Sequence, residues 1–375
     1  MGKTATSDAH IQRSNLRTHI RQLCCLGLPS EQLMPALLKA VRQLVGADSA
    51  GFFWVDAQGD MTNLYAERWL PAAVMKLYFE HYYESGESSF RHAFIERAQA
   101  SNPVIAVSPS SAVERSPYYN EVFRHLDAHH VLYGIVRAQG HALGQLSLYR
   151  PKSAQAFSAA QRSELSSIMH YVVHGVSRRG RIIAGTQTFT DSDDDVVFLV
   201  GHDGEIRQRS SAAHRLLTLA THGKLGREQI ERGTEDKARP VLQLLAERLR
   251  LALMGGEVGP PCLILNTAWG RFVLRAYSIS DTPQAVEGGI AVRIQRQEPT
   301  LLRFVEALGG LGLSPKQREV ALGLAKGSSN REIATAMGVS TNTVAYHVKQ
   351  LFQRLDTHDR EQMIAKILVD GAQAP

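Results

Sequence analysis

The chain has few cysteines and no long apolar run, and both absences restrict what it can be. Only three of its 375 residues are cysteines, Cys24 next to Cys25 and the distant Cys262, so there is neither a disulfide framework nor the CxxC spacing of a metal site. Its apolar runs fall short of the roughly 18–20 residues that a membrane helix needs. The polar segment Met1–Ser14 lacks the apolar stretch of a signal peptide. We therefore expect a soluble, cytoplasmic protein that does not bind membranes.

Catalytic motifs are lacking as well. The sequence contains no glycine-rich phosphate loop, no Ser-His-Asp order and no paired-carboxylate motif. His125, His129 and His130 have a spacing at which two could share a metal on a helix, but no cysteine or carboxylate pair completes the ligand set. The sequence therefore favours a protein that is not an enzyme and holds no metal or cofactor.

Charge is nearly balanced, so it does not by itself reveal a nucleic-acid partner. The 42 basic and 36 acidic residues give a formal net charge of +6, and residues 308–375 carry 8 basic and 6 acidic side chains. A DNA-binding face must therefore be sought in the pattern of residue types.

The first half of the chain has the pattern of an α+β module. Apolar residues recur at helical spacing, then alternate in short runs that are joined by glycine-containing turns, and then recur at helical spacing again. The predicted elements are a helix over Leu33–Val45 ended by Gly46, a hairpin of Ala50–Val55 with Met61–Tyr65, a hairpin of Val131–Ala138 with Ala142–Tyr149, and an amphipathic helix over Ser158–Arg178. Helix, antiparallel strands and closing helix together favour an α+β fold.

A change of composition predicts a linker over Arg178–Asp195, which is basic at first and then acidic. A second α+β module is predicted beyond it, ending at the boundary Glu298-Pro299. Its predicted elements are a strand over Val196–Val200, a short helix that contains Leu216 and Leu217, a helix over Val241–Met254, and strands over Leu263–Leu265, Gly270–Ser278 and Gly289–Ile294.

The last sixty-odd residues predict four short helices with explicit start and stop signals. The segments Ser314–Gln317 and Ser329–Glu332 each have the residue types of a capping box. Gly338 permits a tight turn after the second helix, and Ser340 or Thr341 caps the third.

The third of these helices has a polar outer face without acidic residues. The inward positions at helical spacing are Val344, Val348, Leu351 and Leu355. The outward positions are Asn342, Thr343, Ala345, Tyr346, Lys349, Gln350 and Gln353. No acidic residue occurs from Ile333 to Leu355, as expected of a surface that approaches DNA phosphates. Two short helices joined by a glycine-containing turn therefore predict a DNA-binding helix-turn-helix, with a helical bundle used only for dimer contacts as the alternative.

This segment resembles the LuxR/NarL-type helix-turn-helix family. The matching positions are Leu313, Arg318-Glu319-Val320, Leu324, Gly327, Ser329-Asn330, Glu332-Ile333-Ala334, Met337, Val339-Ser340, Thr343-Val344, His347-Val348, Leu355 and Arg360. The resemblance implies a bacterial transcription regulator whose third helix reads the major groove of double-stranded DNA.

The resemblance also implies which residues contact DNA. It places base contacts at Ala345, Tyr346 and Lys349, and phosphate contacts at Thr341, Thr343 and Arg354, with Asn342 and Gln350 completing the DNA-binding set. This sequence departs from the family at two positions. Ala345 stands where a basic residue is common, and Asp356 stands where glycine is usual. Ala345 can pack against a thymine methyl group, so the preferred DNA sequence can differ from the family norm.

The two N-terminal modules resemble sensor domains. The first is similar to a GAF domain in its order of helix, hairpins and closing helix, and the second to a PAS domain over Phe198–Gly204 and Ser210–Leu217. Of the 26 aromatic residues, 11 lie between Phe52 and Phe94, a density that can line an apolar ligand pocket or form an ordinary core. The candidate ligand-binding residues are Phe53, Tyr65, Trp69, Tyr78 and Tyr82.

The sequence thus predicts a multidomain protein with a GAF-like α+β module over residues 1–180, a PAS-like α+β module over residues 181–299, and an all-α, four-helix LuxR-type head over residues 300–375. The expected function is sequence-specific DNA binding and transcription regulation by a homodimer, under the control of a small-molecule effector or another signal. The apolar stripe of Ser158–Arg178 and the affinity gained from paired half-sites favour dimerisation. The alternatives are an enzyme, or a protein-interaction adaptor, with a docking helical tail.

Overall fold

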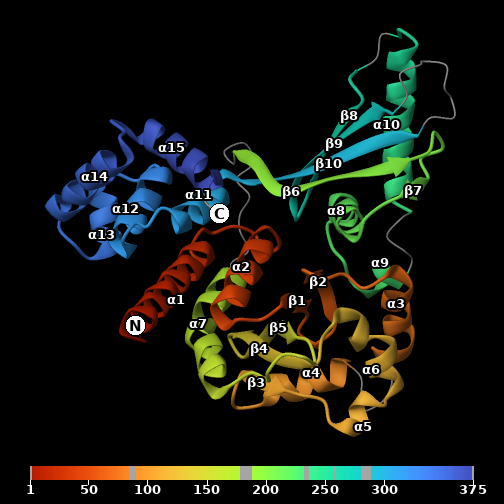
Figure 1. Cartoon of the computed structure of the whole chain (residues 1–375), viewed down its shortest axis with the longest axis horizontal. Coiled ribbons are helices and arrows are strands. Elements are labelled where there is room, and N and C mark those ends of the chain that lie inside the picture. Colours follow the sequence, from red (N-terminus) through yellow and green to blue (C-terminus); the bar gives the residue numbers. More distant parts are fainter. Residues whose placement is uncertain are drawn as a thin grey trace. The chain divides into compact units, whose positions relative to one another are not determined.

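The computed structural model describes residues 2–83, 90–177, 188–231, 236–256, 259–279 and 289–373 (Figure 1). Contacts divide the chain into two compact units, each assembled from segments that are distant in sequence. The helical unit consists of Met1–Gly46, Ser167–Thr188 and Pro299–Pro375, and the sheet unit consists of Ala47–Ser166 and Phe189–Glu298. None of the helices in the ranges given above is both long and apolar enough to cross a membrane.

Two five-stranded sheets form the framework of the sheet unit (Figure 1). The first contains β1 (Ser49–Val55), β2 (Met61–Ala66), β3 (Val104–Val107), β4 (His130–Ala138) and β5 (His141–Arg150), in the order β2-β1-β5-β4-β3. The second contains β6 (Phe189–Val200), β7 (Ile206–Gln208), β8 (Cys262–Thr267), β9 (Gly270–Ser278) and β10 (Ile290–Pro299), in the order β7-β6-β10-β9-β8. The two sheets therefore repeat one topology, in which the first and the last strand of each lie side by side. We call residues 47–166 and 189–298 the first and second sheet modules.

Both predicted hairpins of the first sheet module are confirmed, and their turns have the backbone that the residues allow. Gly59 has a φ of +83° between β1 and β2. Between β4 and β5, Gln139 and Gly140 have φ values of +52° and +80°, the consecutive left-handed conformations that favour a two-residue hairpin turn.

Short helices fill the segment between β2 and β4, where the sequence predicts no regular structure. They are α3 (Ala72–Leu77), the π-helix η1 (Tyr78–Tyr82), α4 (Phe90–Gln99), α5 (Ser111–Glu114), α6 (Pro117–Glu121) and the 3₁₀-helix η3 (Phe123–Leu126). Apolar side chains of α3, η1, α6 and η3 join β2 in one cluster, whose buried members are Met61, Leu64, Leu70, Met75, Tyr78, Phe79, Tyr83 and Val122. Helix α4 packs through Phe94 in a separate cluster with Val55 and Ile135. Tertiary burial of these aromatic residues therefore orders a segment that has no clear period of its own.

The helices of the second sheet module are α8 (Ser211–Thr221), α9 (Arg227–Glu231) and α10 (Ala238–Leu253). The Ser210 side chain caps α8 by accepting a hydrogen bond from the Ala213 amide, and α8 and α10 both contact the second sheet. The fully buried Trp269 donates its indole N–H to the carbonyl of His222 at 3.0 Å. The predicted helices and strands of this module are thus confirmed, with shifted ends.

The predicted linker over Arg178–Asp195 is wrong from Phe189 onwards, because the acidic run lies within β6. The neighbouring strand β10 supplies its partners. Arg293 pairs with Asp195, Arg296 lies 3.3 Å from Asp194, and the Gln297 amide donates to Asp191 at 2.8 Å. From composition alone, such an acidic run is expected to be a solvent-exposed linker. Here it is part of a sheet, because its carboxylates pair with basic residues more than 90 positions away. Residues 178–187 lie outside the described ranges.

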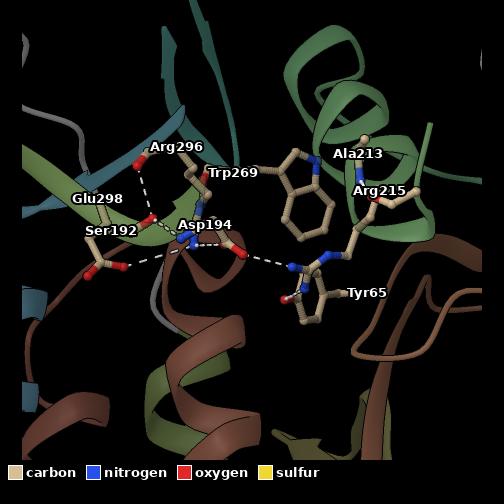
Figure 2. A network of polar contacts seen from close by, with 9 residues as sticks. Tyr65, Ser192, Asp194, Ala213, Arg215, Trp269, Arg296 and Glu298 are labelled. Atoms are coloured by element: carbon tan, nitrogen blue, oxygen red, sulfur yellow. Dashed lines mark hydrogen bonds and ion pairs between the residues drawn. The ribbon is translucent and has the colours of Figure 1, made fainter. Parts of the chain in front are cut away.

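A polar network joins the two sheet modules (Figure 2). The Asp194 carboxylate pairs with Arg215 at 2.7 Å and with Arg296 at 3.3 Å, and Arg215 also donates to the Tyr65 hydroxyl at 3.1 Å. Arg296 is only 2% exposed and donates to the carbonyl of Trp269 at 3.0 Å. The Trp269 ring in turn lies 5.8 Å from the ring of Tyr65, between centroids. Tyr65 belongs to the first module and the other residues to the second, so this network is part of their interface.

We expect Asp194→Asn to lower the free energy of unfolding by about 2–3 kcal/mol, because two partly or fully buried guanidinium groups lose their common counter-charge. Urea unfolding followed by tryptophan fluorescence measures this change. Asp191→Asn is the matched control, since its exposed side chain keeps an acceptor for Gln297, and we expect a change of no more than about 0.5 kcal/mol. Equal effects of the two substitutions would contradict the role given to Asp194.

The helical unit joins the N-terminal residues with the C-terminal head. Its helices are α1 (Gly2–Cys24), α2 (Ser30–Val45), the end of α7 (Ala159–Ser177), α11 (Thr300–Gly310), α12 (Pro315–Ala325), α13 (Asn330–Met337), α14 (Thr341–Leu355) and α15 (Arg360–Gln373). The predicted helices over Leu33–Val45 and Ser158–Arg178 and the four helices of the head are confirmed as α2, α7 and α12–α15. Helices α1 and α11 are not predicted from the sequence, and with α11 the residues from Thr300 onwards form five helices where four are predicted.

Helix α1 packs against α2, α11 and α12, and polar contacts fix it to the first helix of the head. Arg21 Nη2 lies 2.5 Å from the Glu319 carboxylate, and Lys326 donates to the carbonyl of Cys25 at 3.1 Å. His19 is partly buried in the same contact, where burial first and then the charges of Arg318 and Lys39 lower its pKa to about 4. The neutral imidazole is therefore the form that fits between these helices.

The lowered pKa of His19 predicts an acid-sensitive contact. Below pH 6.5 the unfolded chain takes up a proton that the folded chain does not, so stability falls as the pH drops from about 6.5 towards the folded pKa of about 4. We expect His19→Gln to remove about 1 kcal/mol of the loss between pH 7 and pH 5, after allowance for partial solvent access. Unfolding titrations of both proteins at the two pH values measure it, and an unchanged pH dependence would contradict the assignment.

Candidate nucleic-acid interface and ligand cavity

Both predicted capping boxes are present in full. The Ser314 hydroxyl accepts a hydrogen bond from the backbone N–H of Gln317, and the Gln317 side chain accepts one from the backbone N–H of Ser314 at 3.0 Å. Ser329 and Glu332 repeat the arrangement at the start of α13, with a return bond of 2.7 Å. These reciprocal bonds satisfy amide groups that a helix start otherwise leaves unpaired, so the sequence itself sets where α12 and α13 begin.

The turn between α13 and α14 is as tight as predicted. Gly338 has a φ of +63°, a conformation that favours glycine. No atom lies within 4 Å of where its Cβ would be, so lack of space is not the reason for glycine at this position. Ser340, and not Thr341, caps α14 by accepting from the Thr343 amide at 3.1 Å. The cap fixes the start of α14 directly after the turn.

The inner face of α14 packs on α12 and α13. Val344, Leu351 and Leu355 are buried as predicted, whereas Val348 is only partly buried. The neighbouring helices approach closely, since a Cβ on Gly323 of α12 would lie 2.7 Å from the Ile333 side chain of α13. This packing holds α14 with its polar face outward.

The outward face of α14 contains most of the predicted DNA-binding residues. Those with exposed side chains are Thr341, Asn342, Ala345, Tyr346, Lys349 and Arg354, and those with partly buried ones are Thr343 and Gln350. Tyr346 is 59% exposed, which is unusual for so large a ring. Lys349 has no carboxylate partner among the residues that the structure describes. The face therefore offers a free cation and an accessible aromatic ring.

Two of these residues differ from the others in their contacts. The Thr343 hydroxyl lies 2.9 Å from that of Ser340 and takes part in the cap. The Arg354 guanidinium lies beside the turn before α12, because a Cβ on Gly312 would be 3.3 Å from its Nη2 atom. Gln353 lies on the exposed face with Lys349, and helical spacing identifies it as outward even though the resemblance assigns it no contact. Of the outward positions expected from helical spacing, Gln353 is the one that the predicted DNA-binding set leaves out.

A groove runs along the exposed side of α14. Its lining residues are Asn330, Ala345, Val348, Lys349, Phe352, Gln353, Asp356, Thr357 and His358. The single carboxylate in it belongs to Asp356, directly after the acid-free stretch.

Residues 311–367 match the family model described as bacterial regulatory proteins, luxR family. This segment is a LuxR-family helix-turn-helix domain. The structure explains the family glycine that Asp356 replaces, since Asp356 caps α14 in the left-handed conformation with a φ of +51°.

Curated relatives match short stretches of the chain. The putative HTH-type transcriptional regulator YhjB of Escherichia coli (strain K12) is 46% identical over 50 residues, which are 13% of this chain and 25% of that protein. The probable transcriptional regulatory protein SgaR of Hyphomicrobium methylovorum is 40% identical over 53 residues, or 14% and 25% of the two chains. The response regulator protein VraR of Staphylococcus saprophyticus is 26% identical over 110 residues, or 27% and 50%. The chain thus spans between a quarter and half the length of these relatives.

Among solved structures, bacteriophytochrome RpBphP3 from the photosynthetic bacterium R. palustris aligns with 76% of this chain and 63% of its own, at 11% identity and a TM-score of 0.33. No common fold is inferred at this score.

A cavity of about 480 Å³ lies in the first sheet module. Of the five predicted ligand-binding residues, Phe53 and Tyr78 line it, and Tyr65, Trp69 and Tyr82 do not. Tyr65 contacts Arg215, the Trp69 ring meets His214 edge-on, and the Tyr82 hydroxyl donates to Glu121 at 2.6 Å. The lining residues that sequence reasoning missed include Arg97, Tyr118, Tyr119, Phe123, Tyr133, Gln145 and Tyr149. They lie outside the aromatic-rich stretch, and only the fold brings them to it.

The three histidines do not share a helix. His125 lies in η3, His129 directly precedes β4, and His130 is the first residue of β4. The His129 Nδ1 atom lies 2.9 Å from the Tyr119 hydroxyl, and His130 bonds Ser108 at 2.7 Å. Burial lowers the pKa of His129, so its ring is neutral near pH 7. Within the described residues no group of three His, Cys, Asp or Glu side chains could hold a metal ion.

We expect Asp356→Gly to stabilise the end of α14 relative to Asp356→Ala by about 1 kcal/mol, because both remove the carboxylate but only glycine adopts a positive φ without strain. Hydrogen exchange of the α14 amides in the full chain measures the local stability. Equal protection in the two variants would show that the backbone conformation at this position carries no cost.

Proposed function

We propose that the chain is a sequence-specific, DNA-binding transcription regulator of bacterial type. The observation that carries the proposal is the LuxR-family domain over residues 311–367, whose α14 presents an exposed face without acidic residues. The curated relatives that the chain matches are described as transcriptional or response regulators. DNA-binding regulation is therefore the function that this head supports best.

In the proposed complex, α14 enters the major groove with its exposed face towards the bases. Ala345, Tyr346 and Lys349 contact base edges, with the Ala345 methyl suited to thymine. The phosphate contacts come from Thr341, Thr343 and Arg354, and Asn342 and Gln350 extend the surface at either side of this set. A contact with DNA is most strongly expected for Lys349, because its ammonium group has no partner among the described carboxylates.

The remaining parts of the proposal concern regulation. We infer a GAF-like domain over residues 1–180, a PAS-like domain over residues 181–299 and the head over residues 300–375, acting in the cytoplasm as a homodimer on paired half-sites. The repeated strand order of the two sheets and the cavity in the first module support a sensor role for a small-molecule effector. A ligand regulates such a protein only if it binds two arrangements with different affinity.

We expect Lys349→Ala to weaken binding to a duplex enriched from a random library by the full chain, about tenfold, because a charge-assisted contact is lost. Fluorescence anisotropy measures the affinity at several salt concentrations. Lys366→Ala on α15 is the matched control, since that lysine already pairs with Asp370 at 3.4 Å, and it should bind as the unmodified chain does.

Unchanged affinity of Lys349→Ala would remove this residue from the contact set. If the full chain enriches no sequence and leaves no footprint on any duplex, the proposal itself fails, and an adaptor or an enzyme with a docking tail becomes the better reading.

A further inference from the structure

The cavity of the first sheet module has a floor of small side chains and a wall of aromatic ones. Gly51, Ala50 and Ala66 contribute the floor from β1 and β2, where Gly51 pairs with Ala66. The aromatic lining residues include Phe53, Tyr78, Tyr118, Phe123, Tyr133 and Tyr149. Small residues under large rings leave a space whose volume of about 480 Å³ is within the range of small-molecule sites.

The phenols in this wall are neutral. Burial raises the pKa of Tyr78, Tyr118, Tyr133 and Tyr149, and the closeness of several of these hydroxyls to one another raises it further. The wall therefore combines ring faces and edges with uncharged hydroxyl groups, surroundings that favour a flat aromatic ligand over an alkyl chain.

One positive charge lines this cavity without a carboxylate partner. The Arg97 guanidinium lies 4.1 Å above the centre of the Tyr133 ring, and its Nη1 atom donates to the Gln145 side chain at 2.9 Å. Its Nε atom donates to the carbonyl of Ala93 at 2.7 Å. No ion pair joins Arg97 to a carboxylate among the residues that the structure describes. Arg97 is thus surrounded by neutral groups, although its charge is permanent.

The partner of Arg97 is itself held in place. Gln145 is 1% exposed, and its amide nitrogen donates to the Ser147 hydroxyl at 3.2 Å, which turns its oxygen towards Arg97. The other arginine of the lining, Arg68, already pairs with Asp127 at 2.9 Å in an exposed position. The described lining contains no aspartate or glutamate. A ligand with a negative group would therefore find its counter-charge at Arg97.

We propose that this cavity binds an aromatic carboxylate, with its ring among the tyrosines and its carboxylate on Arg97. The proposal rests on the sensor role inferred above and names the chemical class of the effector. A carboxylate matches the fork of a guanidinium group, and a charge-assisted hydrogen bond to the partly buried Arg97 favours the carboxylate over a neutral analogue.

Isothermal titration of the full chain with 4-hydroxycinnamate, its primary amide and octanoate tests the proposal. We expect 4-hydroxycinnamate to bind at least about tenfold more tightly than the amide, which lacks the charge, and than octanoate, which lacks the ring. Equal binding of acid and amide, tighter binding of octanoate, or no binding of any of the three would overturn it.

Two variants locate the site. Arg97→Met should bind the acid and the amide equally, whereas Arg115→Met, an exposed arginine outside the cavity lining, should keep the preference. Gly51→Val should weaken binding of both probes, because its Cβ meets only ordinary contacts of 3.4 Å or more and the added methyl groups take up part of the cavity. A preference for the acid that survives in Arg97→Met, or unchanged binding in Gly51→Val, would place the ligand elsewhere.

Duplex binding separates this proposal from the function on which it rests. Arg97→Met and Gly51→Val are expected to bind the enriched duplex without probe as the unmodified chain does. Their urea unfolding, followed by tryptophan fluorescence, is expected to stay cooperative, which shows that the sheet unit that carries both substitutions and all three tryptophans folds. If the unmodified chain binds 4-hydroxycinnamate but no specific duplex, the regulator function fails and the ligand class stands. If it binds a duplex but none of the probes, the ligand class fails alone.

Discussion

The Asp194 carboxylate lies between two arginines, and the second sheet module depends on this arrangement. Arg215 comes from α8 and Arg296 from β10. Without Asp194, Arg215 would lose its carboxylate partner and the buried Arg296 would keep only Glu298, at 3.9 Å. Arg296 also holds the backbone of Trp269, whose ring fills the contact with the first module. One acidic side chain therefore supports a helix, a strand and the interface between two sheets (Figure 2).

Strand β2 connects this network to the cavity. Leu64 and Ala66 line the cavity, while Tyr65 between them bonds Arg215 of the second module. Successive side chains of a strand point to opposite faces, so Leu64 and Ala66 face the cavity while Tyr65 faces the second module. The second module ends with β10, which carries Arg296 and is followed directly by α11 at Thr300.

Local chemistry explains which features can be predicted from the sequence. The capping boxes at Ser314 and Ser329 and the left-handed turn at Gly338 involve residues within a few positions of one another, and each is present as expected. The exposed face of α14 likewise follows from helical spacing alone. The acidic run of β6 could not be predicted in this way, since its partners Arg293 and Arg296 follow about 100 residues later. The same reason hid Tyr118, Tyr133 and Arg97 from any search for a ligand site.

The sequence by itself determined the helix-turn-helix head, because its caps, turn and buried stripe are all set by neighbours in the chain and by a spaced family pattern. Only the tertiary structure decided that α1 packs on the head, that Asp191 to Asp195 belong to a sheet, and that Tyr65 serves an interface while Tyr133 lines a cavity. These outcomes depend on which buried charge meets which counter-charge and which ring fills which space. The pairing of buried charges and the packing of aromatic rings both involve residues from distant parts of the chain, so they cannot be predicted from a local sequence pattern.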